Sequence, residues 1–342
     1  MASLNQIQKK QEREIYNAFV SAIGEVKDQA VISELANLIN MGDVDGVIDL
    51  LQLSPATYEK LEESIRTTYA IGGATGASQL GRIPTPKGTL VLRFNTRAPA
   101  AEKWLSELSS TRIVEISNET RNVVRSLLTQ GITDGRGPRS VALDLVGRID
   151  PITRKRVGGA IGLTDAQSGW AINARKELEE LNPNYLTRQL RDKRLDGAFK
   201  KSIESGTPMP ASQIDAAVSR LQARTLRYRG ETISKTEALS ALTQGQSEAI
   251  SQALTIGDID GDFTIKFWSA SGKANERVEH VAVESNYPEG LPYDQPFIVD
   301  GVAMQHPRDP AGGAKNVINC GCMLITKINF AGKAAKEIRG FG

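Results

Sequence analysis

The hydrophobic and polar positions at the start of the chain follow the period of an α-helix. In the stretch IQKKQEREIYNAFVSAIGEV, charged residues separate apolar residues at helical spacing, namely Ile7, Ile15, Phe19 and Ile23. The stretch AVISELANLINMGD repeats this pattern and ends at Gly42, a residue that suits the left-handed turn after a helix. These patterns predict helices over residues 4–53.

A glycine-rich stretch follows the next predicted helix. Ser54 and Pro55 suit the start of that helix, because serine caps free N–H groups and proline fits the first turn. The run IGGATGASQLGRIPTPKG, residues 71–88, then predicts a helix end and a flexible loop. A phosphate-binding loop is the alternative, but the run lacks the Lys-Ser/Thr ending of a P-loop and no clear strand precedes it.

Helical patterns continue through the middle of the chain after one strand-like run at 89–95. Long helices are predicted from Ala98 onward, and Thr164 suits the N-cap of a later helix. Further helices are predicted at about 184–204 and 211–255. The middle of the chain is therefore expected to be almost entirely helical.

The pattern changes after Gly257, where the strand-like runs DFTIKFWSA, QPFIVDGVAM and CMLITKINF are separated by turn-rich stretches. We therefore predict an α+β fold, with a mostly helical N-terminal region and a small β-containing C-terminal module. The expected regions are a helical region at 1–80, a central helical and basic region at 81–210, the β-containing region at 211–330 and a tail at 331–342.

Length and composition are those of an ordinary globular protein with two or three domains: 342 residues, 40% hydrophobic and 24% charged. The first residues contain no apolar segment of a signal peptide, and no apolar run approaches the roughly 18 residues that suggest a membrane span. The two cysteines lie one residue apart and do not form an ordinary disulfide staple, which fits a reducing compartment. We expect a protein made in the cytosol, without a membrane partner.

Positive charge is concentrated in the middle of the chain, although the net charge is only +2. Between Thr111 and Lys235, 22 Lys and Arg residues stand against 14 Asp and Glu residues, an excess of +8. This distribution favours contact with double-stranded DNA or an acidic partner, and a solvated helical surface is the alternative. The basic residues that we single out for such a contact are Arg154, Lys155, Arg156, Lys193, Arg194, Arg224, Arg227 and Arg229.

Both histidines and both cysteines of the chain lie in its C-terminal part. His280, His306, Cys320 and Cys322 offer two imidazoles and two thiolates, the number and type of ligands that a structural zinc site uses. Cys-x-Cys spacing is less usual than Cys-x-x-Cys, so other interpretations stay open. The cysteines could be small buried apolar residues, a redox pair, or part of a Cys-His catalytic site, which needs a third orienting group and an oxyanion hole.

The segment that contains these residues resembles the C-terminal domain of phage head morphogenesis proteins, the Mu F-like minor head protein family. The resemblance covers about residues 220–328, and the preceding helix carries Lys235, Thr236 and Glu237 where the family has Arg-Thr-Glu. The matching positions are Lys266, Trp268, Arg277, His280, Phe297, Asp309, Pro310, Asn319, Cys320 and Cys322.

Two positions depart from the family pattern. Gly321 stands where the family has an arginine between the cysteines, and Arg308 replaces the glycine of a Pro-Gly-Asp-Pro turn. Arginine adopts a positive φ less readily than glycine, so the turn is expected to differ. If the family binds a metal, the resemblance implies zinc on His280, Cys320 and Cys322, with His306 or Asp309 completing the shell.

The resemblance implies a minor head (capsid) protein of the virion that is not an enzyme. Such proteins act in head assembly at the portal vertex, in multiple copies, with the portal protein and other head proteins. The basic middle of this chain would then contact packaged or ejected DNA without reading its sequence. The expected location is the phage head near the portal, after assembly in the host cytoplasm. The competing hypothesis is a metal-dependent nuclease or other hydrolase carried in the head, with His280, Asp309 and the cysteines as its site.

Overall fold

The computed structural model describes residues 4–85, 88–151 and 153–330, and the chain divides into two compact units. Unit 1 comprises Met1–Ile15, Glu62–Ser110 and Thr232–Gly342, and unit 2 comprises Tyr16–Leu61 and Thr111–Glu231. These units cut across the sequential regions expected from the sequence, because four long helices contribute residues to both. These helices are α1 (Leu4–Gln29), α4 (Glu59–Gln79), α5 (Pro99–Thr133) and α9 (Ala211–Thr255).

The fold is mostly helical with small antiparallel sheets, which confirms the predicted α+β class. Helix α9 has the bounds that the sequence pattern predicted. In the part of the chain that the structure describes, no helix is both long enough and apolar enough to cross a membrane.

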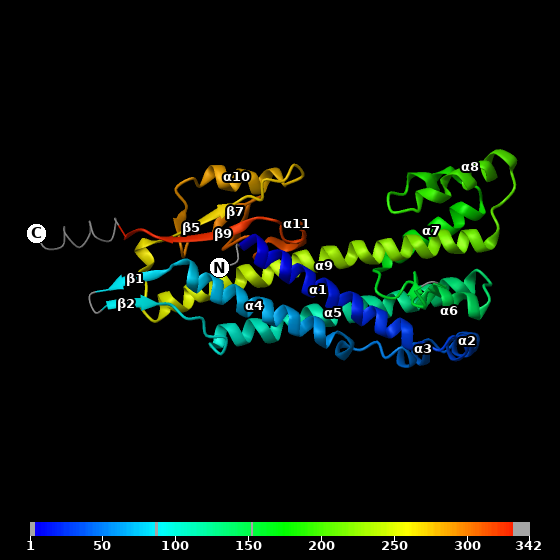
Figure 1. Cartoon of the computed structure of the whole chain (residues 1–342), viewed down its shortest axis with the longest axis horizontal. Coiled ribbons are helices and arrows are strands. Elements are labelled where there is room, and N and C mark those ends of the chain that lie inside the picture. Colours follow the sequence, from blue (N-terminus) through cyan, green and yellow to red (C-terminus); the bar gives the residue numbers. More distant parts are fainter. Residues whose placement is uncertain (1–3, 86–87, 152, 331–342) are drawn as a thin grey trace, which may run out of the picture. The chain divides into compact units, whose positions relative to one another are not determined.

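Unit 2 is mostly helical and contains a small two-stranded sheet (Figure 1). Two predicted helix ends are confirmed: Gly42 follows α2 with a φ of 71°, and the Thr164 hydroxyl accepts a hydrogen bond from the Gln167 N–H at the start of α7. The further elements of unit 2 are α2 (Ile32–Met41), α3 (Val44–Leu50), η1 (Pro55–Tyr58), α6 (Pro138–Val146), β3 (Arg148–Ile149), β4 (Arg156–Val157), α7 (Asp165–Glu179), η2 (Pro183–Thr187), η3 (Lys193–Leu195) and α8 (Asp196–Ser205).

The helix predicted at about 184–204 is wrong over its first part, where the chain forms the two 3₁₀ turns η2 and η3 before α8 begins. The Asn182 side chain accepts a hydrogen bond from the Asn184 N–H, and Asp192 accepts one from the Arg194 N–H. Such local side-chain contacts compete with a continuous helix.

In unit 1, the first part of the glycine-rich run is helical, so the predicted flexible loop is wrong over residues 71–79. Helix α4 continues through Gly72, Gly73 and Gly76 and ends within the run at Gln79, and residues 82–85 form the strand β1. A Cβ added at Gly72 would lie 2.3 Å from the Leu242 carbonyl oxygen, and one added at Gly76 would lie 2.8 Å from the Gln246 Cα. The missing side chains therefore let α4 approach the backbone of α9 closely.

The C-terminal part of unit 1 is a small module around a three-stranded antiparallel sheet with the order β6-β5-β9. Helix α10 packs against β5 and β7 (Figure 1). The run QPFIVDGVAM forms a hairpin whose turn residues, Asp300 and Gly301, both have positive φ, as a two-residue type I′ turn requires. The strands and short helices of unit 1 are β1 (Arg82–Thr85), β2 (Gly88–Val91), η4 (Gly261–Phe263), β5 (Thr264–Ser269), α10 (Val278–Asn286), β6 (Leu291–Pro292), β7 (Phe297–Val299), β8 (Val302–Met304), η5 (Pro310–Gly312), α11 (Gly313–Val317) and β9 (Met323–Ile328).

Candidate metal centre

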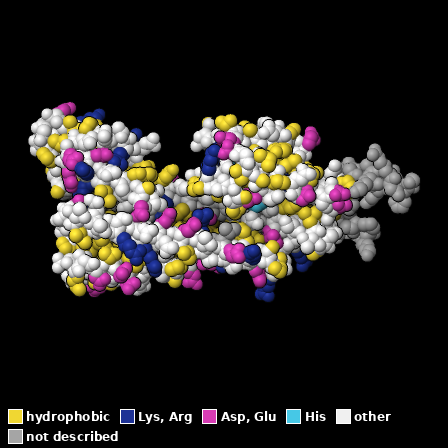
Figure 2. Space-filling view, turned by 180° about the vertical axis from the view of Figure 1, so that it is seen from behind, with side chains coloured by type: hydrophobic (Ala, Val, Ile, Leu, Met, Phe, Trp, Pro, Cys, Tyr) yellow, Lys and Arg dark blue, Asp and Glu magenta, His cyan; other side chains and the backbone are white. Residues whose placement is uncertain are grey.

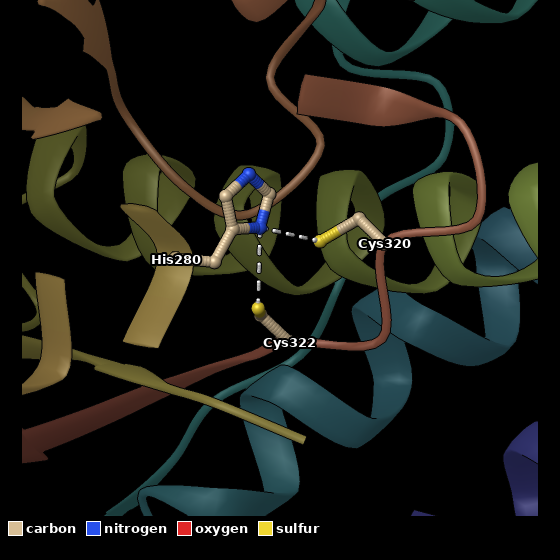
Figure 3. A group of neighbouring side chains, drawn as sticks. All are labelled: His280, Cys320 and Cys322. Atoms are coloured by element: carbon tan, nitrogen blue, oxygen red, sulfur yellow. Dashed lines mark hydrogen bonds between the residues drawn. The ribbon is translucent and has the colours of Figure 1, made fainter. Parts of the chain in front are cut away.

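Three of the four predicted metal ligands meet in the core of the C-terminal module (Figure 3). His280 lies on the first turn of α10, while Cys320 and Cys322 lie in the loop between α11 and β9. Their side chains are buried, with relative exposures of 1%, 2% and 0%. Helix α10 and the loop that leads into β9 therefore bring an imidazole and two sulfurs together in the buried core.

The spacing of the three ligand atoms fits a tetrahedral zinc site. His280 Nδ1 lies 3.4 Å from Cys320 Sγ and 3.5 Å from Cys322 Sγ, and all three atoms lie within 4.8 Å of one another. Zn–N and Zn–S bonds of ordinary length at tetrahedral angles give an N···S separation of roughly 3.5 Å. A zinc ion would therefore fit among these atoms with little movement.

Asn316 on α11 orients the imidazole. Its Oδ1 lies 3.2 Å from His280 Nε2, and Asn316 is itself 2% exposed. With a metal bound, Nε2–H donating to this oxygen would leave the Nδ1 lone pair facing the ion and the sulfurs. Metal-ligating histidines commonly have such a hydrogen-bond partner on the other ring nitrogen.

The sulfurs are part of the apolar core of the module. The Trp268 ring stands edge-on to His280 at 5.5 Å and to Phe297 at 5.6 Å. The core cluster consists of Trp268, Val283, Phe297, Val299, Met304, Cys320, Cys322 and Leu324. The cysteines thus fill core positions, so apolar packing and metal binding are compatible roles for them.

Arg308 places a guanidinium beside the cysteine loop. Its Nη1 donates to the carbonyl oxygens of Cys320 at 3.2 Å and Cys322 at 2.5 Å, and lies 3.9 Å from Cys320 Sγ. Its Nη2 donates to the Thr243 hydroxyl on α9. Arg308 adopts a φ of 65°, a conformation that glycine adopts more readily. Arg308 thus places a guanidinium at the cysteines, although glycine stands between them at position 321.

Charge at the centre is unevenly shared between the two sulfurs. Hydrogen bonds from Cys322 and His280, together with the Arg308 guanidinium, lower the pKa of Cys320 to about 4. The shared hydrogen bond with Cys320 and burial raise the pKa of Cys322. Burial lowers the pKa of His280, but the hydrogen bonds with Cys320 and Asn316 outweigh it and hold the pKa above its ordinary value. These contacts therefore favour the thiolate form at Cys320 over Cys322.

The structure places the fourth predicted ligand elsewhere. His306 Nε2 lies 2.9 Å from Gln244 Oε1, and its Nδ1 lies 3.1 Å from the Pro307 carbonyl oxygen. The alternative ligand, Asp309, accepts hydrogen bonds from the N–H groups of Gln305 and Ala311. Neither residue belongs to the His280, Cys320 and Cys322 group.

The remaining residues of the family pattern support the module around the centre. Arg277 donates to the Ile318 carbonyl oxygen at 2.7 Å, and Lys235 donates to the Asn319 carbonyl oxygen at 2.9 Å, so both hold the segment before Cys320. Lys266 is buried and donates to the carbonyl and side-chain oxygens of Gln305.

Sequence reasoning missed the roles of Asn316, Arg308 and Glu276. Cys322 Sγ donates to Glu276 Oε1 at 3.2 Å. The sequence places Glu276 only four residues before His280, although it lies in the loop that precedes α10. Neither the contact of Asn316 with His280 nor that of Arg308 with the cysteines follows from a local pattern.

Several of the predicted DNA-contacting residues serve the structure of unit 2. Arg229 is 5% exposed and donates to the Gly162 carbonyl oxygen and to Glu119. Arg156 donates to the carbonyl oxygens of Ala30 and Gly147. Arg194 and the half-buried Arg224 pair with Asp192, and the exposed members of the predicted set are Arg154, Lys155, Lys193, Arg194 and Arg227.

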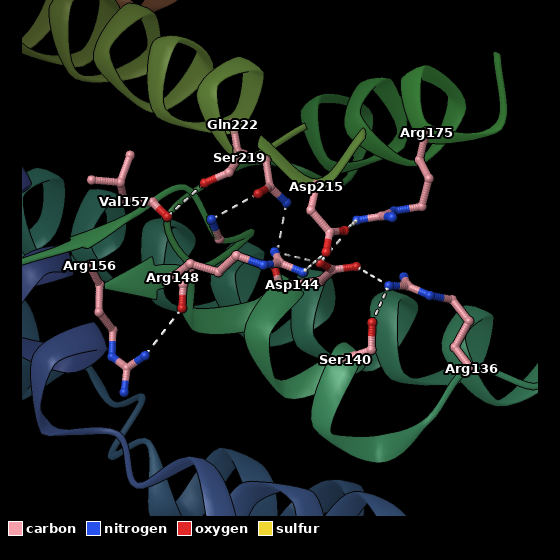
Figure 4. Close-up of polar contacts among 12 residues, drawn as sticks. Arg136, Ser140, Asp144, Arg148, Arg156, Val157, Arg175, Asp215, Ser219 and Gln222 are labelled. Carbon is pink, nitrogen blue, oxygen red and sulfur yellow. Dashed lines mark hydrogen bonds and ion pairs between the residues drawn. The ribbon is translucent and has the colours of Figure 1, made fainter. Parts of the chain in front are cut away.

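Other arginines of the basic middle also have internal partners. The Asp144 carboxylate pairs with Arg136, and its Oδ1 lies 3.3 Å from Arg148 and 3.4 Å from Arg175 (Figure 4). On the face drawn in Figure 2, Lys and Arg side chains lie among Asp and Glu side chains and form no single continuous patch. The excess of positive charge therefore gives less basic surface than its count suggests.

Comparisons with known proteins give no relative for this chain: no family model, no curated protein and no solved structure matches it. The resemblance to the Mu F-like proteins therefore rests on the matching residues alone.

Proposed function

We propose that the C-terminal module is a structural domain closed by a bound zinc ion, with His280, Cys320 and Cys322 as ligands. The observation that carries this proposal is the convergence of the three ligand atoms within 4.8 Å in a dry core. A module with so few buried side chains has little apolar stabilisation of its own. A metal that ties the entrance of β9 to α10 would supply the missing stabilisation.

The protein that contains this module is, in our proposal, a minor head protein of a tailed phage. It would act in head assembly at the portal vertex, with the portal protein and other head proteins. Three residues of the family pattern support this assignment. Trp268 packs on His280, Arg277 donates to the Ile318 carbonyl oxygen, and the Asn319 N–H donates to the Thr236 hydroxyl on α9. The exposed basic residues of unit 2 would contact DNA without sequence preference.

The alternative is a metal-dependent nuclease or other hydrolase. Three protein ligands leave one position free on the metal, as in catalytic zinc sites, and the Cys320, His280 and Asn316 contacts resemble those of a thiol hydrolase. Burial argues against both alternatives, because His280 and the two cysteines expose almost no surface to a substrate. A structural role therefore fits the site better.

The location is tested by quantitative mass spectrometry of purified, DNA-filled particles from the parent phage, with the portal protein as internal standard. We expect this chain in a copy number comparable to that of the portal. Its absence from such particles would contradict the minor head protein assignment.

The metal site is tested by elemental analysis of purified protein and of the variants His280→Asn, Cys322→Ser and His306→Gln. We expect about one zinc per chain in the wild type and in His306→Gln, and its loss in the other two. Chelation of the wild type should lower the thermal stability of the module. A hydrolytic activity that disappears in His280→Asn while the fold persists would instead support the enzyme.

A further inference from the structure

The candidate centre has three ligands, whereas a structural zinc site has four. The missing ligand should be an anion or an imidazole near both sulfurs. Glu276 is the carboxylate that touches the group, because its Oε1 lies 3.2 Å from Cys322 Sγ. Zn–S and Zn–O bonds at tetrahedral angles give an S···O separation of roughly 3.5 Å, close to this distance.

The loop that carries Glu276 is held against the cysteine loop. The backbone N–H groups of Ser271 and Gly272 donate to the two carboxylate oxygens of Glu276 at 2.6 and 2.9 Å. A Cβ added at Gly321, between the cysteines, would lie 3.0 Å from the Ser271 Cβ. Glycine at this position thus lets the two loops meet, which brings the carboxylate to the sulfurs.

We propose that Glu276 is the fourth ligand of a zinc ion at this centre, an inference that rests on the metal site proposed above. Its carboxylate contacts Cys322 and lies outside the compact three-residue group, so it must swing towards His280 and Cys320 to close the shell. Glu276 is only half-buried, and a glutamate side chain has the freedom for this movement. Backbone N–H groups donate to both oxygens of the carboxylate, as hydrogen bonds commonly do for metal-ligating carboxylates.

The charge of the completed centre is balanced. Two thiolates and one carboxylate give a zinc ion a net charge of −1. The buried guanidinium of Arg308, 3.9 Å from Cys320 Sγ, offsets this charge. Buried charges are stable only when they are paired in this way.

The test uses Co²⁺ as the probe for the full chain, because its ligand-field and sulfur charge-transfer bands report the ligands. The variants are Glu276→Gln and the control Glu279→Gln, which removes an exposed carboxylate on the first turn of α10. We expect Glu276→Gln to weaken Co²⁺ binding by at least about 10- to 100-fold and to shift the ligand-field bands. The control should bind like the wild type.

Three results would decide against the inference, and they are distinguishable. If the wild type binds no Co²⁺, the metal site itself fails. If the wild type binds and Glu276→Gln binds equally with the same bands, the site stands and Glu276 is not a ligand. Should Glu276→Gln not fold, Glu276→Cys decides: a third thiolate on the metal should raise the charge-transfer intensity by about half, and an unchanged intensity contradicts the proposal.

Discussion

Arg308 places a charged guanidinium in the buried core of the C-terminal module, where it donates hydrogen bonds to backbone carbonyl oxygens. It is 2% exposed, and its donors reach the carbonyl oxygens of Cys320 and Cys322 and the hydroxyl of Thr243. Its positive φ costs roughly 1 kcal/mol. A glycine at position 308 would adopt this φ without strain. The hydrogen bonds of the Arg308 side chain must therefore stabilise the fold by more than the strain costs.

Replacing Arg308 tests this balance. We expect Arg308→Met to lower the free energy of unfolding by about 3 kcal/mol or more, because buried carbonyl oxygens lose their donors. Arg308→Lys should lose less, since an ammonium reaches fewer of the acceptors. Urea unfolding followed by circular dichroism measures both. Lys315→Met, which removes an exposed ion pair with Asp300, is the control and should keep the wild-type midpoint.

Lys27 in unit 2 is a second buried charge, and its contribution depends on pH. Its Nζ donates to the Gly158 carbonyl oxygen at 2.9 Å, and burial lowers its pKa from 10.5 to about 7. Between these pH values the unfolded chain holds a proton that the folded chain has lost, so stability must rise with pH.

We therefore expect the stability of unit 2 to increase from pH 7 to pH 9, by up to about 1.4 kcal/mol per pH unit from Lys27. Urea unfolding at several pH values measures this slope. Lys27→Met should lose this part of the slope, whereas Lys60→Met, at an exposed position, should keep it. Parallel profiles for the wild type and Lys27→Met would refute the assignment.

At the scale of elements, the close approach of α4 and α9 in unit 1 explains why helix propensity did not predict the helix over residues 71–79. Glycine lowers helix stability by about 1 kcal/mol relative to alanine, so the run at 71–88 reads as a helix end. The gain comes from contact between backbones, as at Gly245, where an added Cβ would lie 2.2 Å from the Tyr69 carbonyl oxygen. A sequence window cannot contain a partner that lies so far along the chain.

Gly72→Ala should therefore destabilise unit 1, although alanine is the better helix former. An added methyl at 2.3 Å from the Leu242 carbonyl oxygen forces the helices apart, at a cost of about 1–3 kcal/mol or more. Gly24→Ala on α1 is the matched control, because nothing lies within 4 Å of its added Cβ. That variant should be stabilised by about 0.5–1 kcal/mol. Thermal unfolding of both variants measures the contrast, and equal effects would show that the glycines only mark a weak helix.

Elements set by local chemistry were predictable from the sequence. The Thr164 cap, the Gly42 turn and the long α9 follow from capping residues and apolar periodicity. The candidate site was only partly predictable. Residue type alone singled out His280, Cys320 and Cys322 as ligands. It could not show that His306 contacts Gln244 instead, because that depends on the tertiary packing of the module. The contact of Asn316 with His280 depends on the same tertiary packing.

At the scale of the whole chain, the distribution of charge separates structural arginines from exposed ones. Asp144 and Asp192 each pair with three arginines of unit 2. Hydrogen bonds from Arg194 hold the pKa of Asp192 at about 2, so this pairing persists at any ordinary pH. Only basic residues on the surface remain for a partner such as DNA.

The double variant Arg154→Glu/Lys155→Glu tests whether these surface charges contact DNA. If both residues touch phosphates, affinity for a random duplex should fall, and the slope of log K against log salt should flatten by about 1.8. Fluorescence anisotropy over a series of salt concentrations measures this slope. Lys9→Glu/Lys10→Glu makes the same charge change on exposed residues outside the basic middle and should leave the slope unchanged. Equal losses in the two double variants would indicate a general effect of net charge.

The interleaving of the two units sets an order for events on the ribosome. Unit 2 ends at Glu231, so all its segments have been synthesised while the last segment of unit 1, from Thr232, is still to come. The early segments of unit 1 can form their contacts with that last segment only after it has been synthesised, and contacts between residues so far apart in sequence form slowly. Both cysteines lie near the end of this late segment. Metal uptake would then come only after the segment from Thr232 to Cys322 has been translated, when every segment of unit 2 has already been synthesised.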